Sequence, residues 1–132
     1  MIIRIIIAFF IMFVVSFNAV AGELTYTCKI IHIYELDKDG SLVISDWEKE
    51  FKGSHFIISR STGEIIGRVV PALLAGSTRI INQGSNEDSF RSIADFENQI
   101  QLIEIQEFVP EANKPFIVKS KDGAGIITGL SN

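Results

Sequence analysis

Two histidines, His32 and His55, are the side chains best suited to metal binding or proton transfer near neutral pH. A zinc site needs further ligands, and the single cysteine, Cys28, does not indicate where they lie. His32 sits between Ile30 and Tyr34 in an alternating segment, which predicts an inward-facing, hydrogen-bonded residue. His55 opens another strand and is expected to be exposed. Neither histidine is therefore predicted to be a metal ligand.

Other polar residues do not form a catalytic pattern. A hydrolytic triad needs a nucleophile beside a histidine and an acid, and none of the serines lies in a nucleophile elbow. Two carboxylate pairs, Glu48 with Glu50 and Glu104 with Glu107, are interpreted as solvated faces because nothing places either pair across a cleft. Residues Gly123–Gly125 predict a hairpin turn and not a phosphate loop. We therefore predict no catalytic residues, no cofactor and no enzymatic activity.

Side-chain oxygens between Asp37 and Glu48 have the spacing of a calcium loop. They recur at the ligand positions of a twelve-residue EF-hand loop, which this stretch resembles. The sixth position normally carries glycine for a sharp turn, but here it is Leu42, and the preceding residues alternate as a strand. Two interpretations stay open: a hairpin turn whose carboxylates face water, which we favour, and a non-EF calcium site at Asp37 and Asp39.

Alternation of apolar and polar residues predicts a chain made of strands. The first runs over residues 24–36, with one buried face, and a turn at Asp37–Gly40 follows it. One short helix is expected over Asp46–Phe51, capped by Asp46, turned inward at Trp47 and Phe51, and ended by Gly53. A β-bulge near Glu104 would explain a slip in phase. Further strands are expected over Leu42–Ile44, His55–Arg60, Ile65–Val70, Thr78–Gln83, Phe90–Phe96, Ile100–Val109, Phe116–Ser120 and Ile126–Leu130.

About eight short strands with glycine-containing turns favour an all-β fold. We predict a small antiparallel barrel or sandwich with at most one short helix. Binding residues on such scaffolds usually lie in loops or at the barrel mouth. The loops Gly84–Ser89 and Pro110–Pro115 are therefore candidate binding sites.

The first 21 residues have the pattern of a secretory signal peptide. Arg4 precedes an uncharged, mostly apolar run over Ile5–Phe17, and Ala19–Ala21 supplies the small residues that cleavage requires. This run is shorter than the roughly 18 residues of a membrane span, although an uncleaved anchor is the alternative interpretation. We predict a signal peptide over 1–21, cleaved after Ala21, and a single domain over 22–132. The domain would be periplasmic or secreted, with no stable membrane span after cleavage.

Composition narrows the set of partners. The chain has a formal net charge of −4, and removal of Arg4 with the signal peptide makes the exported part more negative. A mildly acidic surface argues against binding to nucleic acid or anionic lipid. With one cysteine, an internal disulfide is excluded. Cys28 lies on the apolar side of its strand and is predicted to be a buried small side chain, with a disulfide to another chain as the alternative.

Several stretches resemble small secreted β-rich proteins of Gram-negative bacteria that have no known activity. They are Tyr34-Glu35-Leu36 before Asp39-Gly40, the segment Arg60–Glu64, and the ending Gly125–Leu130. This resemblance implies export and a β-rich fold but no mechanism.

A weaker resemblance is to periplasmic lysozyme inhibitors, which are small eight-stranded barrels. It rests on Tyr26-Thr27-Cys28, which is similar to their Tyr-x-Cys. In those inhibitors the cysteine pairs with a second one near the C-terminus, whereas Ser131 and Asn132 end the sequence here. No inhibitory residues are carried over to this chain.

These observations together predict a non-catalytic exported domain that binds an unknown protein or small ligand in the bacterial envelope. The alternative is a periplasmic inhibitor of a lysozyme-like hydrolase.

Overall fold

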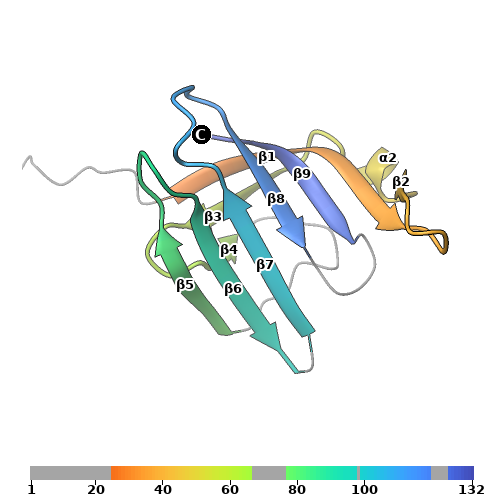
Figure 1. The fold of residues 1–132 in the computed structure, drawn as a ribbon, viewed down its shortest axis with the longest axis horizontal. Coiled ribbons are helices and arrows are strands. Elements are labelled where there is room, and N and C mark those ends of the chain that lie inside the picture. The colour runs from red at the N-terminus through yellow and green to blue at the C-terminus, as the bar shows by residue number, and fades with distance from the viewer. Residues whose placement is uncertain (1–24, 67–76, 98, 120–124) are drawn as a thin grey trace, which may run out of the picture.

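The computed structural model describes residues 25–66, 77–97, 99–119 and 125–132, with the side chain of residue 96 excepted. These residues form one antiparallel sheet of nine strands that curls into a half-barrel (Figure 1), so the predicted all-β class is confirmed. The predicted signal peptide over 1–21 and the residues around Pro71 and Gly123 lie outside the described residues. No helix in the described part of the chain is long and apolar enough to cross a membrane.

The described elements follow the expected order closely. One helical turn, α2, lies among the strands. Each boundary falls within a few residues of its expected place, except that residues 67–70 of the expected strand Ile65–Val70 lie outside the described part of the chain. The elements are β1 (Thr25–Leu36), β2 (Leu42–Ile44), α2 (Glu48–Phe51), β3 (His55–Ser59), β4 (Ile65–Ile66), β5 (Ser77–Gln83), β6 (Phe90–Phe96), β7 (Gln99–Ile105), β8 (Lys114–Lys119) and β9 (Ile126–Ser131).

The sheet has the order β4-β3-β1-β9-β8-β7-β6-β5, and β2 pairs with β1 beyond the end of β3. Strands β5 to β9 form a meander in which each pairs with the next one along the chain. Strand β9 then pairs with β1, so the first and last strands meet in the middle of the sheet (Figure 1). This pairing places the start of β1 beside the residues that follow β7.

A β-bulge in β1 overturns one prediction from the sequence. Ile30 pairs with Gly129 and His32 with Thr128, so Ile31 is an extra residue opposite β9. The bulge reverses the alternation, because one additional residue moves every following side chain to the other face. Ile33 is therefore fully buried, and His32 is half-exposed. The prediction that His32 faces inward is wrong for this reason.

The turn that contains α2 continues the pairing of β1 between β2 and β3. The backbone N–H of Ile30 donates to the carbonyl of Ser54 at 2.9 Å, and that of Gly53 donates to the carbonyl of Ile30 at 2.8 Å. Gly53 ends the helix with a φ of 84°, as predicted. Phe51 is buried, but Trp47 is 38% exposed, so only one of the two predicted inward residues is confirmed.

Two other local predictions are wrong. Trp47 occupies the N-cap position of α2 without a side-chain cap, so Asp46 does not cap the helix. Strand β7 alternates regularly, with Gln101, Ile103 and Ile105 buried, and pairs with both neighbours without a shift. The phase slip in the sequence reflects the end of β7 at Ile105 and not a bulge near Glu104.

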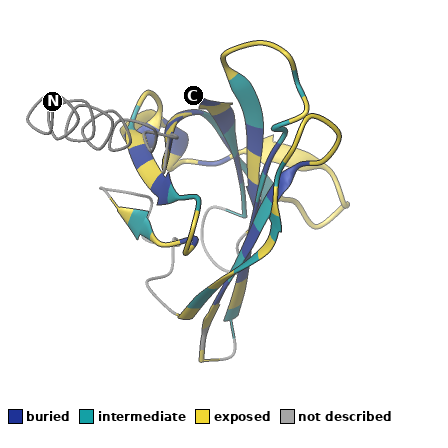
Figure 2. Ribbon diagram, turned by 90° about the vertical axis from the view of Figure 1, so that its left-hand side faces the viewer, coloured by how far each residue is buried: buried dark blue, intermediate teal, exposed yellow. Residues whose placement is uncertain are grey.

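The concave face of the half-barrel holds the hydrophobic core. Buried residues alternate with exposed ones along most strands (Figure 2). Two edge-to-face aromatic pairs join distant strands, Phe56 with Phe116 at 5.4 Å between centroids and Tyr26 with Phe90 at 5.2 Å. The core comprises Tyr26, Cys28, Ile30, Ile33, Phe51, Phe56, Ile58, Phe90, Ile103, Ile105, Phe116, Val118 and Ile127.

The two sides of the half-barrel approach each other through the β3–β4 turn. The Thr78 hydroxyl of β5 donates to the carbonyl of Thr62 at 2.8 Å. A Cβ added to Gly63 would lie 3.1 Å from the Cβ of Ser92 on β6. The turn therefore packs against the far strands of the sheet and narrows the opening between its edges.

Candidate functional site

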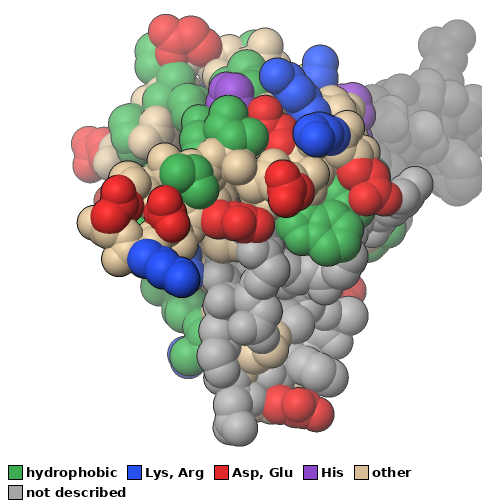
Figure 3. All heavy atoms as spheres, turned by 90° about the vertical axis from the view of Figure 1, so that its right-hand side faces the viewer, with side chains coloured by type: hydrophobic (Ala, Val, Ile, Leu, Met, Phe, Trp, Pro, Cys, Tyr) green, Lys and Arg blue, Asp and Glu red, His purple; other side chains and the backbone are tan. Residues whose placement is uncertain are grey.

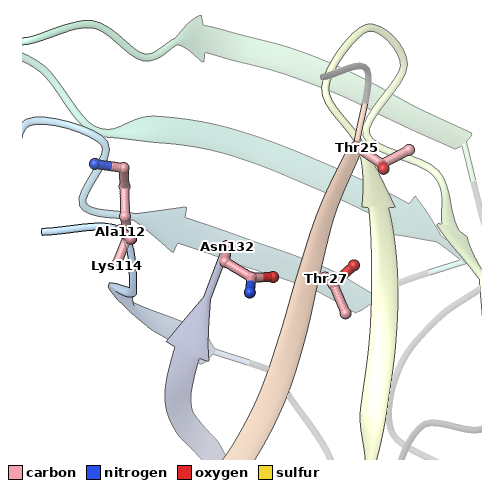
Figure 4. A pocket seen from close by; sticks show the side chains of 5 residues that line it. All are labelled: Thr25, Thr27, Ala112, Lys114 and Asn132. Atoms are coloured by element: carbon pink, nitrogen blue, oxygen red, sulfur yellow. The ribbon is translucent and has the colours of Figure 1, made fainter. Parts of the chain in front are cut away.

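An open groove lies on the outer face of the sheet beneath the loop between β7 and β8. Two adjoining hollows make it up, with volumes of about 510 and 280 Å³. Figure 4 shows Asn132, after β9, between the threonines of β1 and two residues of the neighbouring segment, Ala112 in the loop and Lys114 at the start of β8. We call this the loop groove and define it by Thr25, Thr27, Lys29, His55, Ala112, Asn113, Lys114, Leu130 and Asn132.

Strand alternation supplies the floor of the loop groove. Because Tyr26 and Cys28 of β1 point into the core, their neighbours Thr25, Thr27 and Lys29 point outward. Lys29 pairs in register with His55 of β3. The exposure of His55 confirms the prediction made from its place at the start of a strand.

The loop that overhangs the groove is fixed by its own hydrogen bonds. The Lys114 ammonium donates to the carbonyl oxygens of Val109 and Glu111, the latter at 3.2 Å. The Gln106 N–H donates to the carbonyl of Pro115 at 2.9 Å and so closes the base of the loop. The loop wall is therefore largely formed before any ligand arrives, which lowers the entropic cost of binding.

The lining of the loop groove is polar and offers several hydrogen-bond donors. Its lining offers threonine hydroxyls, two asparagine amides, the Lys29 ammonium and the His55 imidazole, and it contains no carboxylate side chain. These groups suit a ligand with negative charge or several acceptor oxygens.

A second polar cluster closes the end of the half-barrel. The Tyr26 hydroxyl donates to the Glu107 carboxylate at 2.6 Å, and the Arg60 guanidinium lies 3.8 Å from the same carboxylate. Arg60 also lies over the Tyr26 ring, 4.6 Å from its centroid. Burial and then the bond to Glu107 raise the pKa of Tyr26 well above its ordinary value. These groups satisfy one another, and the cluster joins β1 to the end of β7.

The two predicted carboxylate pairs are not simple solvated faces. Glu104 accepts hydrogen bonds from Ser89 and Arg91, each at 3.1 Å, and Glu107 belongs to the cluster described above. Glu48 is 9% exposed, while Glu50 is exposed. Glu48, Glu104 and Glu107 are partly shielded from water by residues of other strands. The sequence alone does not indicate these contacts.

His32 and Glu48 meet at the β1 bulge. The backbone N–H of Ile33 donates to Oε2 of Glu48 at 3.0 Å, and His32 Nδ1 lies 3.5 Å from the same oxygen. The bond from Ile33 holds the pKa of Glu48 below its ordinary value. Glu48 thus takes the place of a neighbouring strand's carbonyl. His32 lies beside a carboxylate but lines neither hollow of the loop groove.

The acidic turn at Asp37–Gly40 is a hairpin turn, with Gly40 at a φ of 87°. Asp39 Oδ1 accepts bonds from the Ser41 hydroxyl and from the Ser41 N–H, and the hydroxyl contact is the main cause that lowers the Asp39 pKa. Among the described residues, no three His, Cys, Asp or Glu side chains gather around a common point suited to a metal ion. The calcium site at Asp37 and Asp39 stays a prediction. A melting temperature that rises with calcium in the wild type, but not in Asp39→Ala, would support it.

The two loops singled out from the sequence differ in their relation to the loop groove. Pro110–Pro115 supplies the wall of the loop groove. Gly84–Ser89 is held by bonds to its own Ser85 hydroxyl and does not line the groove. The sequence reasoning missed Thr25, Thr27 and Lys29, although their alternation with buried residues was visible.

Comparisons with known proteins add no assignment, since no family model, no curated protein and no solved structure matches this chain.

Proposed function

We propose that the chain is an exported, non-catalytic β-domain that binds an acidic ligand in the bacterial envelope through the loop groove. The observation that carries this proposal is the lining: hydrogen-bonding side chains and two exposed cationic or basic ones, Lys29 and His55, without a carboxylate side chain, in a chain of net charge −4. A carboxylate or phosphate group, free or carried by a larger molecule, is the chemistry that such a lining recognises.

The rigidity of the groove supports the same function. Its floor is the outer face of paired strands, where Thr27 exchanges backbone hydrogen bonds with Asn132 at 2.9 and 3.1 Å. Its wall is held by Lys114. Sites on rigid elements bind with little loss of conformational entropy.

Export is the part of the proposal that rests on the sequence of residues 1–21. The mass of the protein recovered from its own host's envelope fraction tests it. A mass that begins at Gly22 supports cleavage after Ala21 and a periplasmic or secreted location, whereas retention of residues 1–21 contradicts it.

Titration of the purified domain with citrate and with inorganic phosphate tests the binding site. Backbone amide signals of Thr25, Thr27 and Asn132 should shift with saturation, and Lys29→Gln should weaken binding by about tenfold because one charged contact is lost. Lys38→Gln is the matched control, since Lys38 lies in the distant β1–β2 turn and the net charge change is identical.

If both substitutions weakened binding equally, the effect would come from net charge alone, which would contradict a site at the groove. Saturable shifts that fall only on other strands would contradict it as well.

One observation favours the alternative function, inhibition of a lysozyme-like hydrolase. Cys28 of β1 lies opposite Ser131 of β9, and the Ser131 hydroxyl donates to the Cys28 sulfur. The resemblance of Tyr26-Thr27-Cys28 to the inhibitors implies a contact between this segment and the C-terminal residues, and the pairing of β1 with β9 is compatible with it. Slower clearing of a cell-wall suspension by lysozyme supports this function, and no effect at excess protein contradicts it.

A further inference from the structure

Strand β2 leaves one row of backbone groups open. It pairs with β1 through Tyr34–Ile44, Glu35–Val43 and Leu36–Leu42, and in the described residues it has no other partner strand. The neighbouring bonds from Asp37 N–H to Ser41 and from Ser45 N–H to Ile33, each 2.8 Å, fix the alternation. The amide groups of Val43 therefore face β1, while those of Leu42 and Ile44 point away from it.

Large apolar side chains surround this open edge. Leu42, Val43 and Ile44 are 52%, 41% and 59% exposed. Leu36 on β1, which pairs with Leu42, and Trp47, three residues after Ile44, are exposed as well. Proteins usually protect an edge strand by keeping it short or by placing lysine, proline or a covering segment on it. Strand β2 is only three residues long, and it carries neither lysine nor proline. We call these five residues the β2 edge surface.

Negative charge borders the β2 edge surface. Six carboxylates and three lysines lie between residues 35 and 52. Glu48 is nearly buried and accepts a hydrogen bond from Ile33, so the border consists of the other five carboxylates, which outnumber the lysines by two. Figure 3 shows acidic side chains in red running between exposed hydrophobic ones in green on this side of the molecule. A second copy of the chain, added edge to edge, would bring the same acidic border against itself, which opposes self-association. Charge complementarity instead favours a basic partner.

We infer that β2 is a strand-addition site, at which an extended segment of another protein, alternating apolar and Lys or Arg residues, pairs with Leu42 and Ile44. The backbone of the partner segment would satisfy the open amide groups. Its apolar side chains would cover the β2 edge surface, with Trp47 as the aromatic anchor. Its cations would face the carboxylates of the border. This site lies apart from the loop groove and does not depend on the function proposed for it.

A synthetic peptide of alternating lysine and valine, six residues long and capped at both ends, is a direct probe. Its binding is followed by anisotropy of a fluorescein label and by emission of Trp47, the only tryptophan in the chain. We expect saturable binding that weakens as salt concentration rises. Ile44→Lys should weaken binding by about tenfold or more, because it removes an apolar contact and adds a like charge.

Ile66→Lys is the matched control, since Ile66 has nearly the same exposure, 60%, on the edge strand β4. It should leave binding unchanged. A peptide methylated at every backbone nitrogen should not bind, because it has no amide to donate.

Four outcomes would overturn the inference: no saturable binding of the lysine–valine peptide, equal binding of a glutamate–valine peptide, unchanged binding after full methylation, or equal weakening by both variants. Self-association that Ile44→Lys removes would assign the edge to a second copy and would also overturn it.

Discussion

At the scale of single residues, burial governs the chemistry of Cys28. The side chain is fully enclosed, and burial raises the pKa of its thiol to about 12, although the bond from Ser131 acts in the opposite direction. The thiolate is the reactive form of cysteine, so the folded protein holds this group in an inert state. The predicted buried small side chain is confirmed, and a disulfide from Cys28 to another chain would require the fold to open.

Thiol labelling tests this inertness. Reaction of Cys28 with an aromatic disulfide reagent should be slower in the native protein than in urea-unfolded protein by at least about a thousandfold, because labelling must wait for opening. A rate within a few-fold of the unfolded one would show that the thiol is accessible.

Glu48 links acid pH to stability at the same scale. The N–H bond from Ile33 keeps its pKa below its ordinary value of 4.5 in the folded state. The unfolded chain then takes up the proton first, so this stabilisation is complete above about pH 4.5 and is lost as pH falls through the folded pKa.

Glu48→Gln removes that dependence while keeping a carbonyl acceptor for Ile33. Between about pH 6 and about pH 3, the wild-type free energy of unfolding should fall more steeply than that of Glu48→Gln. Denaturant unfolding at each pH gives both slopes, and Glu64→Gln, at an exposed carboxylate, controls for the change in net charge. Parallel slopes for wild type and Glu48→Gln would contradict the role assigned to the Ile33 bond.

At the scale of elements, the pairing of β1 with β9 depends on one glycine. A Cβ at Gly129 would lie 1.9 Å from the carbonyl oxygen of Lys29 and 2.7 Å from a ring carbon of Phe116. No side chain fits there without separating the two strands. The close approach lies at the β1 bulge, where Ile30 pairs with Gly129. The bulge brings the two backbones together, and the missing side chain of the glycine leaves room for this contact.

Gly129→Ala should therefore lower the free energy of unfolding by more than about 3 kcal/mol. Gly40→Ala is the comparison, since an added Cβ there meets nothing within 4 Å and only the positive φ is disfavoured. Its cost should be about 1 kcal/mol. Urea unfolding measures both, and similar losses for the two variants would mean that the strands separate easily.

At the scale of the whole molecule, a half-barrel needs a device that holds its end together. The Tyr26–Glu107–Arg60 cluster provides one, since it links the start of β1, the turn after β3 and the residues after β7. Phe90 of β6 packs on the Tyr26 ring and extends the link to a fourth strand.

Loss of the Tyr26 hydroxyl should weaken this end of the sheet. Tyr26→Phe leaves the aromatic contacts in place but leaves Glu107 without its shortest bond, and should cost about 1–3 kcal/mol. Thermal and urea unfolding measure this loss. Tyr34→Phe, on a half-exposed side chain of the same strand, should cost less. An unchanged stability in Tyr26→Phe would show that the ring packing alone closes the barrel.

Period-2 alternation was enough to predict the all-β class and most strand positions from the sequence. It failed where backbone geometry intervened: one extra residue at Ile31 turned His32 outward, and a bulge expected near Glu104 was instead the end of β7. One part of the loop groove could be predicted from the sequence, because the residues of Pro110–Pro115 are typical of a loop. The role of Lys29 in the floor could not be predicted, because it depends on β1, β3 and β9 lying side by side. That arrangement is set by long-range strand pairing.

The neighbourhood of β1 and β9 also has a consequence for the order of events during synthesis. The first strand emerges from the ribosome long before the ninth, and its central partner does not exist until Ser131 has been added. Non-local pairing of this kind delays folding, because the chain must close a long loop before the contact contributes. A nascent chain of this design cannot form the β1–β9 pairing until β9 has left the ribosome, so the middle of its sheet is completed late in folding.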